Sequence, residues 1–170
     1  MPVADNFDGF LKIDGVTSES KDPDHKHWID VDSFSFGCEV SDFAIGEAGK
    51  LVADDPSVQP FIFKQGMHKG SPTLFLYCVT GKQIPTAEFH ARTAGGETQH
   101  IYFKAKFTDC LITNVSTDTN GESLPMETIT LAYRAVELSY HEQNSKTGGA
   151  FGGAVVVSYD QAAHAEEEPS

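Results

Sequence analysis

The residues best suited to chemistry in this sequence are the two histidines of the segment DHKHW, His25 and His27. Residues two apart in a strand point to the same face, so such a pair can ligate a metal ion. Asp24 and Asp30 are the nearest carboxylates, but no third imidazole follows at a suitable spacing. A solvated polar loop is therefore favoured over a metal site, and no metal or cofactor is expected.

The glycine-rich stretch GGAFGG, residues 148–153, resembles a phosphate-binding loop only in composition. It lacks a GK[ST] ending and precedes a predicted strand, whereas phosphate-binding backbone amides lie at a helix N-terminus. The sequence also contains neither GxSxG nor HExxH, and none of its many carboxylates forms a recognisable acid–base pair. We therefore predict a flexible loop here and expect no catalytic residue, so the chain is not expected to be an enzyme.

The three cysteines, Cys38, Cys78 and Cys110, are far apart and odd in number. This spacing argues against a disulfide framework and against a zinc knuckle. Each cysteine has apolar neighbours in the sequence, which favours small buried side chains.

Length and charge exclude several classes of protein. The chain has 170 residues and a net charge of −13, which fits a single domain and disfavours binding to nucleic acid or anionic membrane. No apolar run approaches the ~18 residues of a membrane span. The first fifteen residues have neither a basic nor an apolar segment, so we expect no classical secretory signal. One domain is predicted over residues 1–160, followed by an acidic, disordered tail over 161–170.

A two-residue alternation of apolar and polar side chains predicts strands along most of the chain. The segments are 7–13, 28–38, 61–64, 87–92, 101–108, 129–140 and 155–159, with a hairpin turn at 94–97. The apolar parity becomes mixed after Asp109 and is reversed between Tyr133 and Val136. Bent strands whose inward face changes are typical of closed or nearly closed barrels.

The segment SPTLFLYCVTGK predicts the chain's one clear helix. Ser71 suits the N-cap, Pro72 the first turn and Gly81 the left-handed position after the C-terminus. Its side chains are apolar nearly all the way round, which predicts burial on more than one side. Two faces of the helix can be distinguished, but the pattern leaves open which one meets the barrel; their residues are Leu74 and Cys78, and Phe75 and Val79.

Residues 41–60 break the strand pattern with glycines, aspartates and prolines. Most connections in compact domains are about 4–6 residues long, so a segment of this length needs a function. We predict a long extended loop.

Five segments together resemble one family, Hcp, the tube protein of bacterial type VI secretion systems. They are FLKIDGVTSES, HKHWIDVDSFSFG, SPTLFLYCVTGKQIP, RTAGGETQHIYFKAKFTDCLITNVS and ETITLAYRAVELSY, and they cover most of residues 7–142 in the family's order. The resemblance implies a mainly β fold: a small β-barrel of two packed antiparallel sheets with one flanking α-helix (about 71–80) and the extended loop (about 41–60).

The same resemblance implies hexameric rings that stack into a hollow tube, which is exported folded from the bacterial cytoplasm. The implied partners are further copies of the chain, secreted effectors, and the spike and sheath of the secretion machine. On this reading Phe34 and Phe36 face the core, and Ser33 and Ser35 face the lumen and contact cargo. The long loop would join stacked rings through Ala44, Ile45, Gly46, Glu47, Leu51 and Val52. The helix would contact its own barrel and a neighbouring subunit through Leu74, Phe75, Cys78 and Val79.

Three alternatives remain open from the sequence. A cupin-like barrel that binds a small molecule or metal would have an interior cavity with converging polar groups. A hydrolase with an unrecognised site would have a cleft with perturbed carboxylates. A member of the family could also act as a soluble effector chaperone, because a ring can serve both roles.

Overall fold

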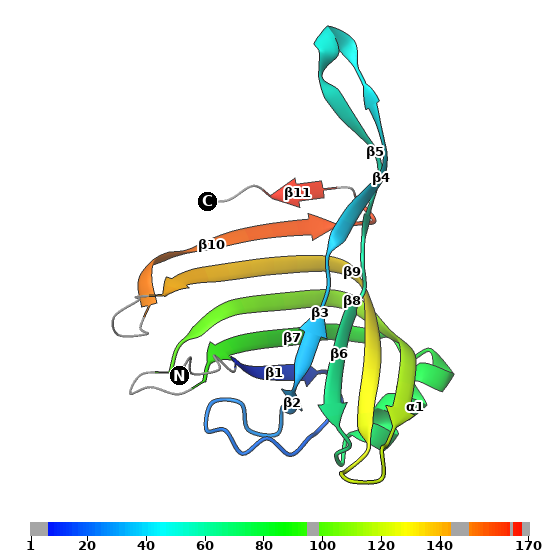
Figure 1. Ribbon diagram of the computed structural model, residues 1–170, viewed down its shortest axis with the longest axis vertical. Coiled ribbons are helices and arrows are strands. Elements are labelled where there is room, and N and C mark those ends of the chain that lie inside the picture. The colour runs from blue at the N-terminus through cyan, green and yellow to red at the C-terminus, as the bar shows by residue number, and fades with distance from the viewer. Residues whose placement is uncertain (1–6, 95–98, 144–149, 164, 168–170) are drawn as a thin grey trace.

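The computed structural model describes residues 7–94, 99–143, 150–163 and 165–167. Within these residues nine strands form one antiparallel sheet that curls into a nearly closed barrel, and two form a separate hairpin (Figure 1). The strands are β1 (Phe7–Ile13), β2 (Ile29–Val31), β3 (Ser33–Ser35), β4 (Cys38–Ile45), β5 (Leu51–Val58), β6 (Phe61–Gly66), β7 (Ile84–Thr93), β8 (Ile101–Asp118), β9 (Met126–Gln143), β10 (Ala150–Asp160) and β11 (Ala165–Glu167). The described residues contain no helix long and apolar enough to cross a bilayer.

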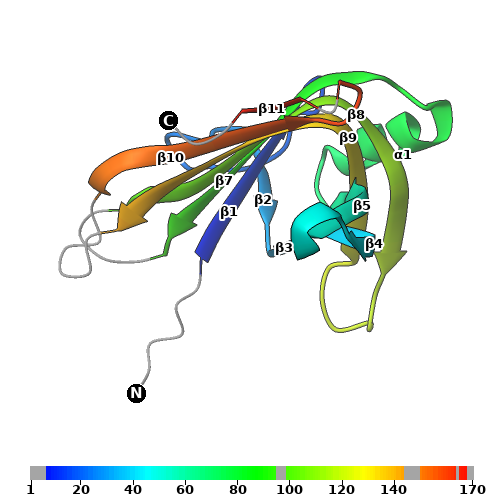
Figure 2. The same ribbon diagram turned by 90° about the horizontal axis from the view of Figure 1, so that it is seen from above.

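The barrel has two walls joined by the long strands β8 and β9. One wall has the order β11-β10-β9-β8-β7-β1-β2, and the other contains β3, β6 and the first part of β9. Residues 126–131 of β9 pair with β6, while residues 135–143 pair with β10. Figure 2 shows how the sheet turns sharply between these halves. The predicted mainly β barrel with one helix is confirmed.

The bend lies where the apolar parity predicted it. Asp109 in β8 has a left-handed φ of 52°, and the register between β8 and β9 shifts between Ile112 and Asn114. An extra residue of this kind bends a strand and increases its twist. Across the bend, Tyr133 and Val136 both reach the core although they have opposite parity.

The barrel interior is filled by side chains, chiefly aromatic ones. Phe61, Phe63, Phe89 and Phe107 are fully buried, and the ring centroids of Phe61 and Phe107 are 5.0 Å apart. Phe34 also packs on this cluster, with its ring centroid 4.5 Å from that of Phe89. A small barrel whose interior side chains meet in this way has a packed core and no lumen of its own.

The strand expected over residues 28–38 is divided in two. β2 pairs with β1, whereas β3 pairs with β6 on the other wall. The break falls at Asp32, whose backbone N–H donates to the carbonyl of Lys64 at 2.9 Å. The chain therefore crosses from one wall to the other at this residue, which an alternating pattern cannot reveal.

The C-terminal part of the chain is more regular than expected. β11 pairs with β10 through the register Asp160–Ala165 to Ser158–Glu167, so the structure places a short strand within the tail expected over 161–170. The edge of β10 offers unpaired backbone groups, and pairing satisfies them. β10 also begins at Ala150, inside the glycine-rich stretch expected as a loop. Residues 95–97 of the expected hairpin turn lie outside the described residues, and so do Gly148 and Gly149 of the glycine-rich stretch.

Candidate assembly surfaces and the buried polar network

The segment 41–60, predicted as a loop, is a two-stranded hairpin that we call the arm. β4 and β5 pair from Cys38–Val58 to Ile45–Leu51, and a short 3-10 turn, η1 (Glu47–Gly49), joins them. The turn needs left-handed conformations at Ala48 and Gly49. Val58 at the base of the arm packs on the barrel core, and the cross-strand pairs extend the arm beyond it. Figure 1 shows the arm projecting beyond one end of the molecule.

One face of the arm is apolar toward its tip, beyond the polar pair Glu39–Ser57. Paired residues of an antiparallel ladder share a face, and the pairs Phe43–Ala53 and Ile45–Leu51 lie together. Phe43, Ile45 and Leu51 are 67, 75 and 69 % exposed. The opposite face carries the pairs Ala44–Val52 and Asp42–Asp54 and is mixed in character. Of the residues expected here, Gly46 is constrained by space, since a Cβ would lie 2.6 Å from Cγ2 of Val52.

The helix α1 (Ser71–Thr80) has a buried and an exposed face. Leu74 is fully buried, and Tyr77 and Cys78 pack against the core beside it. Phe75, Leu76 and Val79 are more than half exposed, although the apolar sequence predicted burial on more than one side. The face of Leu74 and Cys78 therefore meets the barrel, and α1 flanks it beside β8 (Figure 2). Gly81 ends the helix in the predicted left-handed conformation, with a φ of 62°.

Ser71 does not cap the helix as predicted; Gly70 occupies the N-cap position and makes no side-chain cap. The Ser71 hydroxyl instead donates to Oε1 of Glu127 on β9 and accepts from the backbone N–H of His68 at 3.0 Å. Glu127 is 3 % exposed and also receives a hydrogen bond from Nε2 of Gln65 at 3.3 Å. A buried carboxylate thus ties the start of α1 to the barrel wall.

Ser33 and Ser35 lie on the exposed side of β3, and Phe34 between them points into the core. Their partners across the ladder are Lys64 and Ile62. The predicted alternation is confirmed, and Phe36 also packs on the core as predicted. Whether the serines line a lumen depends on assembly and stays a prediction.

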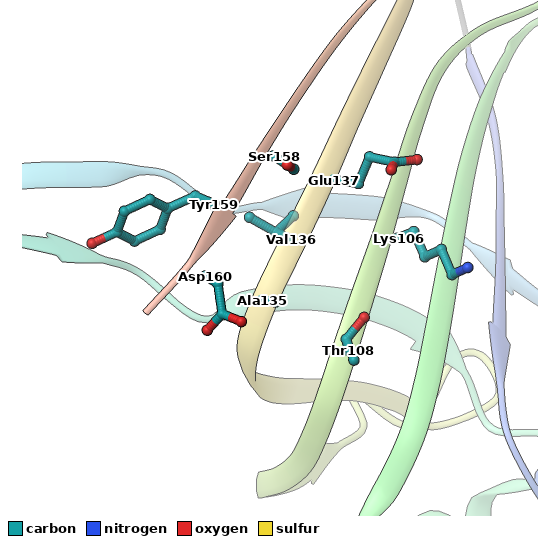
Figure 3. A pocket seen from close by; sticks show the side chains of 8 residues that line it. All are labelled: Lys106, Thr108, Ala135, Val136, Glu137, Ser158, Tyr159 and Asp160. Carbon is teal, nitrogen blue, oxygen red and sulfur yellow. The ribbon is translucent and has the colours of Figure 1, made fainter. Parts of the chain in front are cut away.

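The outer face of the large wall carries a row of alternating charges. Lys12 faces Glu88, Glu88 faces Lys106, and Lys106 faces Glu137 on successive strands. Opposite charges placed directly across strands each contribute roughly 0.2–1 kcal/mol. Figure 3 shows the end of this row, where β8, β9 and β10 line a shallow polar pocket of about 310 Å³. The opposite charges of Lys106 and Glu137 neutralise each other, and the pocket is open to solvent, so it is suited to contact with another protein surface.

A buried polar network that the sequence did not predict joins the loop before β2 to β7. Asp22 Oδ1 lies 2.8 Å from Nδ1 of His25, and Nε2 of His25 lies 2.8 Å from Nδ1 of His90. His90 Nε2 lies 2.7 Å from Oε1 of Glu88. Arg92 completes the network by pairing with Asp22 at 2.7 Å and with Asp8 on β1 at 3.0 Å.

Burial explains the electrostatics of this network. Burial alone raises the pKa of Asp22, but hydrogen bonds from His25 and Arg92 outweigh it and lower that pKa to about 2. Burial lowers the pKa of His90 and outweighs the hydrogen bond to Glu88, which raises that pKa. The ring of His25 stacks on Phe10 at 4.2 Å, so the loop covers a strand face that would otherwise be solvated.

The expectation that both histidines lie in a solvated loop is therefore wrong for His25 and confirmed for His27. His25 is 1 % exposed and hydrogen-bonded at both ring nitrogens, whereas His27 is exposed. The two do not share a site. Among the described residues, no group of three or more His, Cys, Asp or Glu side chains is arranged to hold a metal ion.

Comparison with known proteins gives a consistent result. Residues 10–140 match the family model described as type VI secretion system effector, Hcp. The chain is 36 % identical over 146 residues to protein hcp1 of Pseudomonas aeruginosa, an alignment that covers 84 % of this chain and 90 % of that protein. The crystal structure of Hcp1 from Salmonella typhimurium superposes with a TM-score of 0.75 at 32 % identity, over 95 % of this chain and 99 % of that one. A structure described as a type six secretion system protein gives a TM-score of 0.84 at 27 % identity, with the same coverage.

Proposed function

We propose, on the premise that this chain belongs to the Hcp family of type VI secretion system effectors, that it closes into hexameric rings which stack into a hollow tube. In this role it is exported folded from the bacterial cytoplasm and carries or chaperones effectors in the lumen. Its partners are its own copies, the effectors, and the spike and sheath of the secretion machine.

The observation that carries this proposal is the exposed apolar face of the arm. A lone two-stranded hairpin is marginally stable in water, and this one exposes Phe43, Ile45 and Leu51 toward its tip. Burying one such side chain is worth roughly 1.5–3 kcal/mol. A second copy seated against the arm would recover this free energy, which suits contact between stacked rings.

The helix supplies a separate candidate for closing each ring. Phe75, Leu76 and Val79 form an exposed apolar stripe, well away from the arm in Figure 1. A ring closes through heterologous contacts, in which one patch of each subunit meets a different patch of the next. Two distinct apolar surfaces therefore fit two distinct contacts, one within a ring and one between rings.

The interior of the barrel bears on the cupin-like alternative. That alternative requires a cavity with converging polar groups, but the interior is filled by Phe61, Phe63, Phe89 and Phe107. The packed core favours a structural role for the fold over ligand binding inside it.

Native mass spectrometry and light scattering of the full chain test ring formation. We expect a hexamer for the native chain and loss of the ring for Phe75→Ser combined with Val79→Ser. Leu124→Ser is the matched control, because Leu124 is 72 % exposed and belongs to neither surface. A native chain that stays monomeric at high micromolar concentration would contradict the proposal.

Deleting residues 44–53 separates the two contacts. We expect this deletion to abolish tubes in electron micrographs and to leave isolated rings. Rings that fall apart instead would show that the arm belongs to the contact within the ring.

Cargo contact is tested at β3. Small hydroxyl side chains at Ser33 and Ser35 let cargo touch a wall without the strong binding of a buried apolar contact. Ser35→Gln should reduce effector retention in a pull-down while the ring persists. Unchanged retention would exclude Ser35 as a cargo contact.

A further inference from the structure

A histidine-rich pocket lies apart from the arm, the helix stripe and β3. Its volume is about 350 Å³, at the lower end of the range of small-molecule sites. The loop before β2, the end of β7, the start of β8 and the end of β9 all contribute to it. Its lining includes Asp24, His25, Arg92, His100, Lys104 and His141.

Three buried nitrogen atoms of the lining have no hydrogen-bond partner among the described residues. They are Nε of Arg92, Nε2 of His100 and Nδ1 of His141. The rings of His100 and His141 are nearly perpendicular, with centroids 5.8 Å apart. Buried polar atoms are almost always paired, and an unpaired one costs about 1–3 kcal/mol. The pocket therefore offers a ligand the Nε–H of Arg92, and the two imidazole nitrogens donate as well when they are protonated.

The donors are held in place by the buried network. Arg92 is 7 % exposed, and its two terminal nitrogens are fixed by Asp22 and Asp8. Its Nε is left to bind a ligand, and the guanidinium carbon lies 4.8 Å from the ring centroid of Phe10. Because the side chain is pinned in this way, little conformational entropy is lost when Nε binds a ligand.

Nitrogen donors favour an anion over a metal ion in this pocket. Arg92 and Lys104 bring two cations into the lining and Asp24 brings one carboxylate. Arg92 is already paired with Asp22 and Asp8, so the charge of Lys104 weighs most. A divalent ion would be repelled by the cations and would find too few ligands, since the described residues hold no metal-binding group of three. Acceptor oxygens, in contrast, match nitrogen donors and form charge-assisted hydrogen bonds with them.

We propose that this pocket binds a tetrahedral oxyanion, a phosphate or sulfate group, through Lys104, Nε of Arg92 and the imidazoles of His100 and His141. A protonated imidazole carries a donor on each ring nitrogen, so we expect the affinity to rise on acidification. Burial lowers the pKa of His90, which lies behind the wall beside His25. The carboxylates that face this group, and oppose the anion, are Asp8, Asp22, Asp24 and Glu88.

Sulfate is the best first probe, because it keeps its charge where phosphate gains a proton. Proton–nitrogen NMR spectra of the full chain are recorded during sulfate titrations at about pH 6 and about pH 7.5, the range in which histidine titrates. We expect saturable shifts around the pocket and tighter binding at the lower pH. Inorganic phosphate and glycerol phosphate then show whether the anion is free or attached to a small molecule; tighter binding of either supports the site.

Lys104→Gln and Lys106→Gln form a matched pair. Both remove one cation from the same face of β8, but Lys106 lines the pocket of Figure 3 instead. Losing a hydrogen bond to a charged group should weaken sulfate binding roughly tenfold in Lys104→Gln, with no change in Lys106→Gln. His100→Gln should remove much of the pH dependence and serves as a second variant.

Three results would overturn the proposal: no sulfate binding at the lower pH, equal loss in both lysine variants, or binding of Zn²⁺ in place of sulfate. Light scattering of the same samples keeps this test separate from that of ring assembly. Hexamers that do not bind the anion would contradict the pocket proposal alone. A monomer that binds sulfate would contradict the assembly proposal alone.

Discussion

Nε2 of His25 lies 2.8 Å from Nδ1 of His90, and both rings are buried. With the contacts to Asp22 and Glu88, three hydrogen bonds connect two imidazoles and two carboxylates. Each bond needs one proton, and ionised carboxylates only accept. Two neutral imidazoles supply two protons, so the complete chain of bonds requires a third and makes the pair cationic.

The proton count of this pair is measurable. Burial lowers the pKa of His90, so we expect nitrogen NMR to show two protonated ring nitrogens in the pair at about pH 7.5 and a third only as the pH falls into the lower part of the histidine range. Three protonated nitrogens already at the higher pH would mean that the carboxylates outweigh burial.

Asp22 should stabilise the fold in a pH-dependent way. Its pKa is about 2 in the folded chain against 3.8 as the ordinary value, so its contribution is complete above the ordinary value and is lost as the pH falls through the folded one. Asp22→Asn should lower the free energy of unfolding by roughly 1–2 kcal/mol at neutral pH, after discounting for solvent screening. Asp24→Asn is the exposed control. Urea unfolding at several pH values measures the difference in unfolding free energy between the native chain and Asp22→Asn. A difference that persists near pH 2 would contradict the prediction.

The bond from Ser71 to Glu127 should matter more than an ordinary helix-end contact. Ser71→Ala leaves a buried carboxylate with one donor fewer, so we expect a loss of about 1–3 kcal/mol in unfolding free energy. Thr80→Ala removes a bond to the carbonyl of Leu76 at the exposed end of the same helix and should cost much less. Chemical denaturation followed by circular dichroism compares them; equal losses would show that Glu127 does not depend on Ser71.

Stacking should depend on one face of the arm. Ile45→Ser combined with Leu51→Ser removes the apolar pair at its tip and should prevent tubes while hexamers remain. Val52→Ser on the mixed face should weaken tubes less, since that face also carries Asp42 and Asp54. Electron microscopy and light scattering distinguish the two, and the reverse order would assign stacking to the mixed face.

The three thiols should differ in reactivity. Cys38 is exposed, contrary to the expectation that every cysteine is buried. Burial, with Asp109 nearby, raises the pKa of Cys110 to about 12. A thiol reagent followed by mass spectrometry should label Cys38 rapidly and Cys110 only after unfolding, because the thiolate is the reactive form. Rapid labelling of Cys110 in the folded chain would show that the barrel opens locally.

Short-range patterns predicted the strands, the helix and the bend. The change of parity around Tyr133 located the sharp turn of β9, and Gly81 located the end of α1. These features depend on residues close in the sequence, whose spacing alone decides which face is apolar.

Features that depend on distant partners were not predictable in this way. Alternation placed His90 and Arg92 on a polar face, and nothing nearby in the sequence indicates that the loop carrying Asp22 and His25 covers them. The arm was missed for the opposite reason. Its strands contain aspartate and proline, its turn contains two glycines, and its regularity comes from pairing across the hairpin.

The uninterrupted passage of β8 and β9 from one wall into the other has a mechanical consequence. Their ladder continues from Phe103–Tyr140 to Asp118–Met126 across the bend. A pull along the strands would load many of these bonds together in shear, whereas separate sheets could be peeled apart one bond at a time. A subunit built in this way resists being pulled apart along its strands.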